Sequence, residues 1–436
     1  MHWFSRLARK TAPAVLALLA ILSRGARAEP PLTLEQALAE AAARNARLPV
    51  SEMDVAASQQ QLVAARGARL PRLSVESTLQ VAPPDLSYGT GGASSFAGEE
   101  RLQIVGRQTL YDGGALRAGV TGAESQVRSS RAAFRVAQKD LELEVRTRFS
   151  ELLKTQDDLA SREQGLDRLR SYLAIIRQRK AAGEGLQADL LKTETRLAGE
   201  QADAEEARRK LRTAQLQLND LLGRDPEAPL VAASLPAPQP PPLLQTEPWQ
   251  QVPDLALVKA DQAVAEANVG VARAGRRPHL DVLADAGLHG GGFANDVPSS
   301  SLGGRLRNDL GASLTLSISW PFLDFGIYDG QVGQAQARAE QTRRRVVMQS
   351  RETRLRWEAA REDIAQWYRQ VQLRQRALPL ARDAYLVAES LYRGGSGTAL
   401  EVLDAFSSLI AASQSYTDAL LSYHVAEAML LRWGTP

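Results

Sequence analysis

Few residues of the chain are suited to catalysis or metal binding. The four histidines are His2, His279, His289 and His424. None has the spacing of a metal ligand set or a partner for a nucleophilic triad. The absence of cysteine excludes disulfides, thiolate metal sites and a lipid-bearing cysteine at the mature N-terminus. The sequence therefore predicts no enzyme, no metal site and no cofactor.

Glycine-rich segments offer no phosphate-binding loop either. The clusters at 89–92 and 290–292 follow no strand-to-helix turn of the kind that cradles phosphates, so we interpret both as plain loops. No single catalytic or binding motif indicates the function of this chain. Its function therefore has to be inferred from the arrangement of its predicted helices and strands.

The first 28 residues are predicted to be a secretory signal peptide. Basic residues precede a short apolar run, 14–22, and Ala26-Arg27-Ala28 forms a small-residue cleavage site. A retained membrane anchor is the less favoured alternative, because the run is too short to span a bilayer. We expect the protein to be exported.

Removal of this leader changes the charge balance. Residues 1–28 hold five Lys or Arg and no Asp or Glu, which leaves 48 basic and 50 acidic residues in the mature chain. This balance argues against a nucleic-acid partner. No later segment approaches 18 consecutive apolar residues, so no transmembrane helix is predicted.

Two tandem repeats make up nearly all of the remaining chain. ARGARLPRLSV (65–75) aligns with ARAGRRPHLDV (272–282) at an offset of 207. QTLYDGG (108–114) aligns with WPFLDFG (320–326) at an offset of 212, which is kept as far as the hairpin tips and is 211 at the end of each copy. We assign the first repeat to 29–228, an extended proline-rich linker to 229–249, and the second repeat to 250–436.

Each repeat is predicted to end in a helical hairpin, 113–222 in the first and 326–433 in the second. Apolar residues recur every seven positions, at Val145, Leu152, Leu159, Leu166 and Leu173 in the long helix of the first repeat. A sustained heptad pattern with charged residues between is typical of coiled-coil packing. A compact bundle of ordinary amphipathic helices is the weaker alternative, because it needs no helix of this length.

Four segments alternate between apolar and polar residues: 73–82, 101–111, 280–288 and 310–322. Each has about the 9–11 residues that a tilted strand needs to cross a bilayer. Tyr111, Trp320 and Phe322 lie at the helix-side ends, where an interfacial aromatic belt is expected. A small soluble β-sandwich is the less favoured alternative, because it needs more strands.

An open sheet edge is not tolerated in hydrocarbon, so four strands cannot form a membrane structure alone. We therefore expect several chains to pool their strands, two giving eight and three giving twelve. A periplasmic coiled-coil adaptor or scaffold also has helical hairpins. However, such proteins carry one hairpin and no lipid-patterned strands.

The order of these features resembles the TolC-type outer-membrane channel family over residues 33–434. The resemblance is carried by LTLEQAL (32–38), the pre-strand segments ending at Pro71 and Pro278, and the exits LYDGG (110–114) and FLDFG (322–326). It implies a homotrimer in the outer membrane of a Gram-negative bacterium. Its fold would be α plus membrane β, a twelve-stranded barrel continuous with a long α-helical coiled-coil periplasmic tunnel.

The resemblance also implies partners and a role for the hairpin tips. The channel would be the exit duct of a tripartite efflux or type I secretion system, docked to a periplasmic adaptor and an inner-membrane pump or ABC transporter. The tips are GEGLQAD (183–189) and GSGTALE (395–401). By position, the adaptor-facing residues are Gly183, Gly185, Leu186, Gly395 and Leu400.

In this family two inward acids three residues apart form a carboxylate ring at the periplasmic entrance. The corresponding residues here are Glu401 and Asp404, and the alternative is that they only cap and solvate a helix start. The basic residue that often locks the closed entrance is replaced by Gly397, although its usual partner, Asp189, is present. We therefore expect the closed entrance to be held differently from that of family members in which a basic residue pairs with this aspartate.

Overall fold

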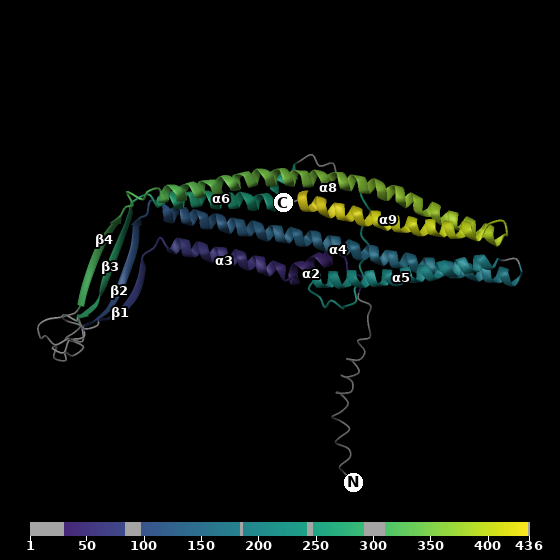
Figure 1. Cartoon of the computed structure of the whole chain (residues 1–436), viewed down its shortest axis with the longest axis horizontal. Coiled ribbons are helices and arrows are strands. Elements are labelled where there is room, and N and C mark those ends of the chain that lie inside the picture. The colour runs from purple at the N-terminus through teal and green to yellow at the C-terminus, as the bar shows by residue number, and fades with distance from the viewer. Residues whose placement is uncertain (1–29, 83–96, 184–185, 242–246, 292–309, 435–436) are drawn as a thin grey trace, which may run out of the picture. The chain divides into compact units, whose positions relative to one another are not determined.

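The computed structural model describes residues 30–82, 97–183, 186–241, 247–291 and 310–434 (Figure 1). The predicted signal peptide, Gly185 and the glycine cluster 89–92 lie outside these residues. Among the described helices, none combines the length and apolar composition needed to cross a bilayer.

The described residues form two compact units, and each takes segments from both repeats. The tip unit is made of the described residues within 30–46, 138–247 and 356–434, and the sheet unit of those within 47–137 and 248–355. Two helices of 67 residues, α4 (Ala115–Ala181) and α8 (Ile327–Arg393), contribute to both units.

The sheet unit carries one antiparallel sheet in the order β1-β2-β3-β4. The strands are β1 (Arg72–Ala82), β2 (Ala97–Tyr111), β3 (His279–Gly291) and β4 (Leu310–Ser319). The repeats meet in the centre of this sheet, where Leu102 of β2 lies opposite Leu288 of β3. Consequently β1 and β4 are its two edges.

Several strand ends differ from the sequence prediction, and β2 begins at Ala97 rather than at residue 101. β4 ends at Ser319 rather than at Phe322, because Pro321 has no N–H to donate to a neighbouring strand. The Phe322 N–H donates instead to the Trp320 carbonyl (2.9 Å) in a turn.

β3, by contrast, continues beyond the predicted end at residue 288. Gly290 and Gly291 pair with Glu100 and Glu99 of the longer β2. These two glycines were expected in a loop and lie in a strand, so the interpretation of the 290–292 cluster as a loop was wrong for them.

One face of the sheet is apolar and exposed. Leu73 of β1 is 76% exposed and Leu314 of β4 is 77% exposed. The other face is polar, and there the Thr109 hydroxyl donates to the Asp281 carboxylate (2.6 Å). Strict alternation along the strands produces this division.

Equivalent aspartates begin the two long helices. The carboxylates of Asp112 and Asp324 each accept the backbone N–H groups two and four residues later, which caps α4 and α8. The residues that follow them, Gly113 and Phe325, have left-handed φ angles of 69° and 50°. Both repeats therefore leave the sheet through the same turn.

Two shorter helices of the sheet unit, α3 (Arg47–Gly67) and α6 (Pro253–Ala274), each lie beside the long helix of their own repeat. Arg66 of α3 pairs with Glu124 of α4 (2.8 Å), and Arg343 of α8 pairs with Glu266 of α6 (3.0 Å). These exposed ion pairs add little stability and mainly mark the register between helices.

The tip unit contains α2 (Leu34–Arg44), α5 (Gln187–Leu221), α9 (Ala399–Gly434) and the ends of α4 and α8. Most of the predicted heptad positions are buried in it, among them Val145 and Leu152 at 0% exposure. Continuous burial at this spacing is what antiparallel coiled-coil packing requires.

The described part of the linker is fixed to the tip unit by hydrogen bonds. Ala232 forms a parallel bridge with Leu32, and the Gln215 amide donates to the Leu230 carbonyl (2.9 Å). The Tyr423 hydroxyl accepts the Gln239 N–H (3.0 Å) and donates to the Gln239 carbonyl (2.9 Å). The linker continues into the short 3-10 helix η1 (Pro248–Gln251).

Candidate functional site

The first hairpin tip joins α4 to α5. Gly183 has a φ of 82°, and its N–H donates to the Lys180 carbonyl (3.0 Å), which ends α4. Leu186 is 68% exposed and precedes α5 without a side-chain cap. Asp189 is partly buried in the first turn of α5.

In the second tip, between α8 and α9, a different set of hydrogen bonds ends α8. The Ser396 N–H donates to the Leu391 carbonyl (3.0 Å) and the Gly395 N–H to the Tyr392 carbonyl (3.1 Å). This pair of bonds is a Schellman motif, with Gly395 at a φ of 79°. Leu400, just after the turn, is 65% exposed.

Gly397, at the position where the resemblance leads us to expect a basic residue, lies close to the end of α8. A Cβ atom on Gly397 would lie 3.0 Å from both the Leu391 Cβ and the Tyr392 backbone nitrogen. A side chain here would require the start of the turn to shift by a few tenths of an ångström, so the turn is closely packed around glycine.

Glu401 takes part in a capping box at the start of α9. The Glu401 N–H donates to the Thr398 hydroxyl (3.3 Å), and the Thr398 N–H donates to the Glu401 carboxylate (2.9 Å). The sequence Thr-Ala-Leu-Glu carries the signature of this motif, which the sequence reasoning did not use.

Asp404 lies one turn beyond Glu401, and both carboxylates are exposed. Residues three apart on a helix occupy the same face, so the two side chains are neighbours. The repeat offset makes Glu401 the counterpart of Asp189 in the first tip. A carboxylate ring built from these residues remains a prediction.

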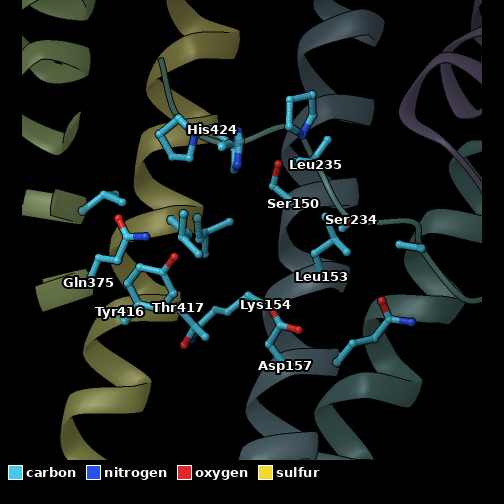
Figure 2. A pocket seen from close by; sticks show the side chains of 18 of the residues that line it. Ser150, Leu153, Lys154, Asp157, Ser234, Leu235, Gln375, Tyr416, Thr417 and His424 are labelled. Carbon is cyan, nitrogen blue, oxygen red and sulfur yellow. The ribbon is translucent and has the colours of Figure 1, made fainter. Parts of the chain in front are cut away.

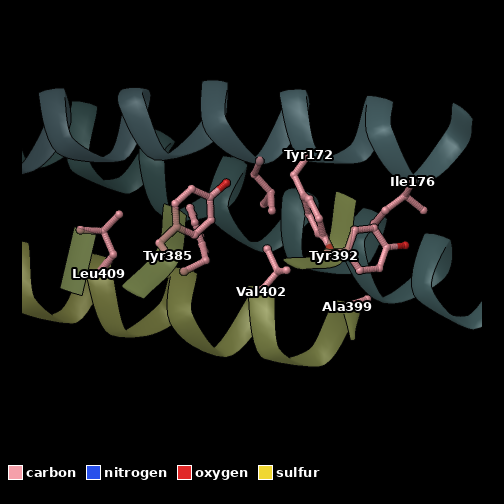
Figure 3. Packing of buried hydrophobic residues seen from close by; sticks show 9 residues of the cluster. Tyr172, Ile176, Tyr385, Tyr392, Ala399, Val402 and Leu409 are labelled. Carbon is pink, nitrogen blue, oxygen red and sulfur yellow. The ribbon is translucent and has the colours of Figure 1, made fainter. Parts of the chain in front are cut away.

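A cluster of buried apolar residues lies next to the tips and joins the two hairpins of the tip unit (Figure 3). Tyr172 of α4 packs edge to face on Tyr392 of α8, with ring centroids 5.2 Å apart, and Tyr385 of α8 packs on Phe406 of α9 (6.1 Å). The remaining members are Leu169, Ile176, Ala399, Val402 and Leu409. The packing holds α4, α8 and α9 together.

Arg179 adds a polar contact between the hairpins that sequence reasoning missed. Its guanidinium donates to the Tyr392 carbonyl and lies 4.9 Å from the centroid of the Tyr392 ring. The two hairpins are thus joined near their tips by an arginine close to the end of α4. No repeat or motif in the sequence marks this residue.

Burial and negative charge act together on the tyrosines of the cluster. Burial raises the pKa of Tyr392, and the Asp189 carboxylate raises it further, against the opposing effect of Arg179. Burial, with the neighbouring Glu389, raises the pKa of Tyr385 to about 12. These hydroxyls stay protonated at neutral pH, so no charge develops inside the cluster.

The predicted aromatic belt lies in the sheet unit, at the ends of β2 and β4. Tyr111 is 48% exposed, Trp320 59% and Phe322 82%. Such exposure of large apolar side chains is unusual for a soluble surface and matches the exposed apolar face of the sheet.

The tip unit also contains a cavity of about 410 Å³ beneath the linker, between α4, α8 and α9 (Figure 2). Lys154 beside it pairs with Asp418 (2.9 Å) and Asp158 (3.5 Å). Burial raises the pKa of Asp157, and the adjacent Asp158 raises it further. Across the described residues, no three His, Cys, Asp or Glu side chains come together as a metal site.

Comparison with known proteins shows that the hairpin tips and the sheet lie within the matches to a single protein family. The model of the family described as outer membrane efflux proteins matches residues 37–224 and 247–433, one match for each repeat. The chain belongs to the outer membrane efflux protein family. The two matches confirm the tandem repeat architecture of this efflux protein.

Known relatives agree with this assignment. The outer membrane efflux protein BepC of Brucella suis biovar 1 is 23% identical over 407 residues, which cover 92% of this chain and 84% of BepC. A crystal structure of CusC superposes with a TM-score of 0.83 at 19% identity, covering 92% of each chain. The open state of the Neisseria gonorrhoeae channel MtrE gives 0.79 at 20% identity, covering 92% of this chain and 89% of MtrE.

The efflux protein is therefore an outer-membrane transport channel with the TolC-type fold, and proteins of this family are not enzymes. The resemblance found in the sequence is confirmed. The alternative of a non-conducting periplasmic adaptor or scaffold is not supported.

Proposed function

We propose that three copies of this efflux protein assemble into one channel, the exit duct of a tripartite efflux or type I secretion system. The observation that carries the proposal is the sheet of the single chain. Its apolar face is exposed, and β1 and β4 leave its two edges open. The open edges are not stable in a bilayer until copies of the chain close the sheet, whereas the apolar face is suited to contact with lipid.

Closure by three copies gives twelve strands, in agreement with the resemblance found in the sequence. Leu73, Leu314 and their apolar neighbours would then face lipid, and polar residues such as Asp281 would line the lumen. Tyr111, Trp320 and Phe322 would form the aromatic belt at the periplasmic edge of the bilayer.

The hairpin tips would dock a periplasmic adaptor that connects the channel to an inner-membrane pump or ABC transporter. Leu186 and Leu400 support this role, because each presents an exposed apolar side chain beside a glycine turn. Gly183, Gly185 and Gly395 would let the adaptor approach the backbone closely.

Glu401 and Asp404 would form the carboxylate ring at the periplasmic entrance, with Asp189 beside it. Three copies would place six carboxylates of the second tip around one opening, which favours cations. Arg179 and the aromatic cluster would hold this entrance closed in the absence of partners.

Conductance of the purified mature protein in a planar bilayer tests the proposal. We expect a small cation-selective conductance that grows or loses selectivity in the variant Glu401→Ala/Asp404→Ala. An unchanged conductance in the variant would support the proposed channel and contradict the assignment of Glu401 and Asp404 as its gate. The absence of conductance from inserted protein would contradict the proposed duct.

A further inference from the structure

The cavity beneath the linker has the dimensions of a small-molecule site. Its volume of about 410 Å³ falls within the range of pockets that hold small organic ligands. Residues 232–238 of the linker form one side, and α4, α8 and α9 form the others (Figure 2). The lining residues all lie away from the hairpin tips and belong to the tip unit alone.

Apolar side chains make up much of the wall. They are aliphatic residues of three helices and prolines of the linker: Leu153 of α4, Val371 of α8, Leu420 and Leu421 of α9, and Pro236 and Pro238. Contact with such a wall favours a ligand that has an apolar body.

One carboxylate in the wall lacks a counter-ion. Within the described parts of the chain, the Asp157 carboxylate forms no ion pair and no hydrogen bond. Burial raises the pKa of Asp157 and the adjacent Asp158 raises it further, and no basic side chain offsets either effect. An ionised carboxylate in such surroundings is unfavourable unless a cation accompanies it.

The charge of Lys154, which also lines the cavity, is already neutralised. Its ammonium lies 2.9 Å from the Asp418 carboxylate and 3.5 Å from the Asp158 carboxylate. With Asp157, this group of residues carries one positive and three negative charges. The cavity is therefore acidic, and Lys154 is not available to Asp157.

Two other basic side chains near the cavity have partners of their own. Arg374 of α8 donates to the Ser415 carbonyl (3.3 Å). The Nδ1 atom of His424 lies 3.3 Å from the Glu427 carboxylate, and Figure 2 shows His424 at the opposite end of the cavity from Asp157. A cation beside Asp157 would therefore have to come from outside the chain.

Tyr416 of α9 lies near Asp157. Burial raises the pKa of the Tyr416 hydroxyl, and the Asp157 carboxylate raises it further. Tyr416 is therefore protonated at neutral pH, and Tyr368 of α8 adds a second aromatic ring to the wall. Aromatic rings attract cations through their negative faces, so both residues suit the same ligand as Asp157.

We propose that this cavity binds an organic cation, an amine or quaternary ammonium compound that carries an apolar body. The charged group would lie beside Asp157 and Tyr416. The body would contact Leu153, Val371 and Leu420. An anion would meet the excess of negative charge. A metal ion would lack ligands, because no three His, Cys, Asp or Glu side chains come together in the described residues.

A ligand in this cavity would contact the linker and three helices at once. Anything that binds only the folded state stabilises that state by mass action. Binding should therefore slow hydrogen exchange in residues 232–238 and raise the melting temperature of the protein. The site does not depend on how many copies of the chain assemble.

Titration with the aromatic cation ethidium tests the inference, in full-length protein held in phosphatidylcholine nanodiscs. We expect saturable binding by fluorescence and slower exchange in residues 232–238. Asp157→Asn should weaken binding at least about tenfold, because the charged partner is lost. The matched control is Asp167→Asn, since Asp167 is an exposed residue of α4 that pairs with Arg170 (3.0 Å). The control should bind ethidium as the native protein does.

Two further variants assign the binding to the cavity. Ser234→Trp adds bulk at an exposed lining position of the linker without changing charge, and it should also weaken binding. Glu401→Gln/Asp404→Asn removes the acids of the proposed entrance and should leave ethidium binding unchanged. The anionic dye anilinonaphthalene sulfonate should not compete with ethidium.

Several outcomes would overturn the inference. Native protein that shows no saturable binding would do so, as would equal binding by native protein and Asp157→Asn. Protection of the tips instead of residues 232–238, with binding lost in the Glu401/Asp404 variant, would place ethidium at the entrance. None of these results decides whether the protein is a duct, which conductance of the same preparations tests separately.

Discussion

Thr398 and Glu401 bond to each other reciprocally at the start of α9, each backbone N–H donating to the other's side chain. The carboxylate proposed to line the entrance therefore also secures the first turn of its helix. Asp404, one turn later, does not belong to this capping box. Substitutions can consequently distinguish the role of Glu401 from that of Asp404.

Thr398→Ala removes one half of the capping box. We expect a loss of about 1 kcal/mol in the stability of the first turn of α9, because an orphan N–H loses its acceptor. Hydrogen exchange at residues 399–403 should accelerate. Exchange in α5, which has no side-chain cap, provides the internal reference. Unchanged exchange in α9 would contradict the role of the cap.

Glu401→Gln removes the charge and keeps an oxygen that can accept the Thr398 N–H. We expect cation selectivity to fall while exchange protection of α9 stays as in the native protein. Asp404→Asn should lower selectivity in the same way. Reversal potentials across a salt gradient measure this effect, and native selectivity in the double variant would exclude the carboxylate ring.

Arg179→Met removes the contact with the Tyr392 carbonyl and ring. Loss of a charge-assisted hydrogen bond at a partly buried site costs about 1–2 kcal/mol, so the proposed entrance should open more often. Conductance recordings should show larger or more frequent openings. Arg177→Met is the matched control, since Arg177 forms an exposed ion pair with Glu194 (2.9 Å) within one hairpin.

Asp157→Asn should stabilise the protein at neutral pH. Burial raises the pKa of Asp157, so its ionised form opposes folding at pH values above the raised pKa. The penalty is relieved as pH falls through that value, and below the unfolded pKa the variant and the native protein should converge. Thermal unfolding at pH 7 and pH 3 checks this; a lower melting temperature of the variant at pH 7 would contradict it.

Glu40→Gln should have the opposite dependence on pH. The Arg224 guanidinium donates to both Glu40 oxygens (2.6 and 2.7 Å) and lowers the pKa of Glu40. The stabilisation, about 1 kcal/mol for this partly buried pair, is complete above the unfolded pKa of Glu40. It is lost as pH falls through the lower folded value. The variant should therefore melt earlier at pH 7, and this difference should shrink as the pH falls below the unfolded pKa of Glu40.

Periodicity and repetition predict most of this fold. Alternation of apolar and polar residues predicted all four strands, and the heptad repeat predicted buried residues such as Leu152 in the helical hairpins. Each pattern can be recognised because it reflects one continuous buried or lipid-facing surface. Strand ends were predicted less well. Pro321 stops β4 through a missing donor, and Gly290 remains in β3 because β2 is long enough to pair with it.

Contacts at the tips could be predicted only in part. The capping box follows from the spacing of Thr398 and Glu401 and was available in the sequence. The contact between Arg179 and Tyr392 joins helices of different repeats 213 residues apart, and no local pattern encodes such a pairing. The conformation of Phe325 was equally hidden, because alignment with Gly113 shows the difference but not the left-handed backbone.

The paired aspartate caps have an evolutionary consequence. Asp112 and Asp324 hold the same turn in both halves, so this turn existed in the ancestral gene before its duplication. The divergence of Gly113 and Phe325 came afterwards. An ancestor with identical halves would have carried the same residue after both aspartates, whereas the modern halves differ at this position. In the proposed trimer, duplication and divergence would thereby have replaced six interchangeable subunits with three that have a fixed order.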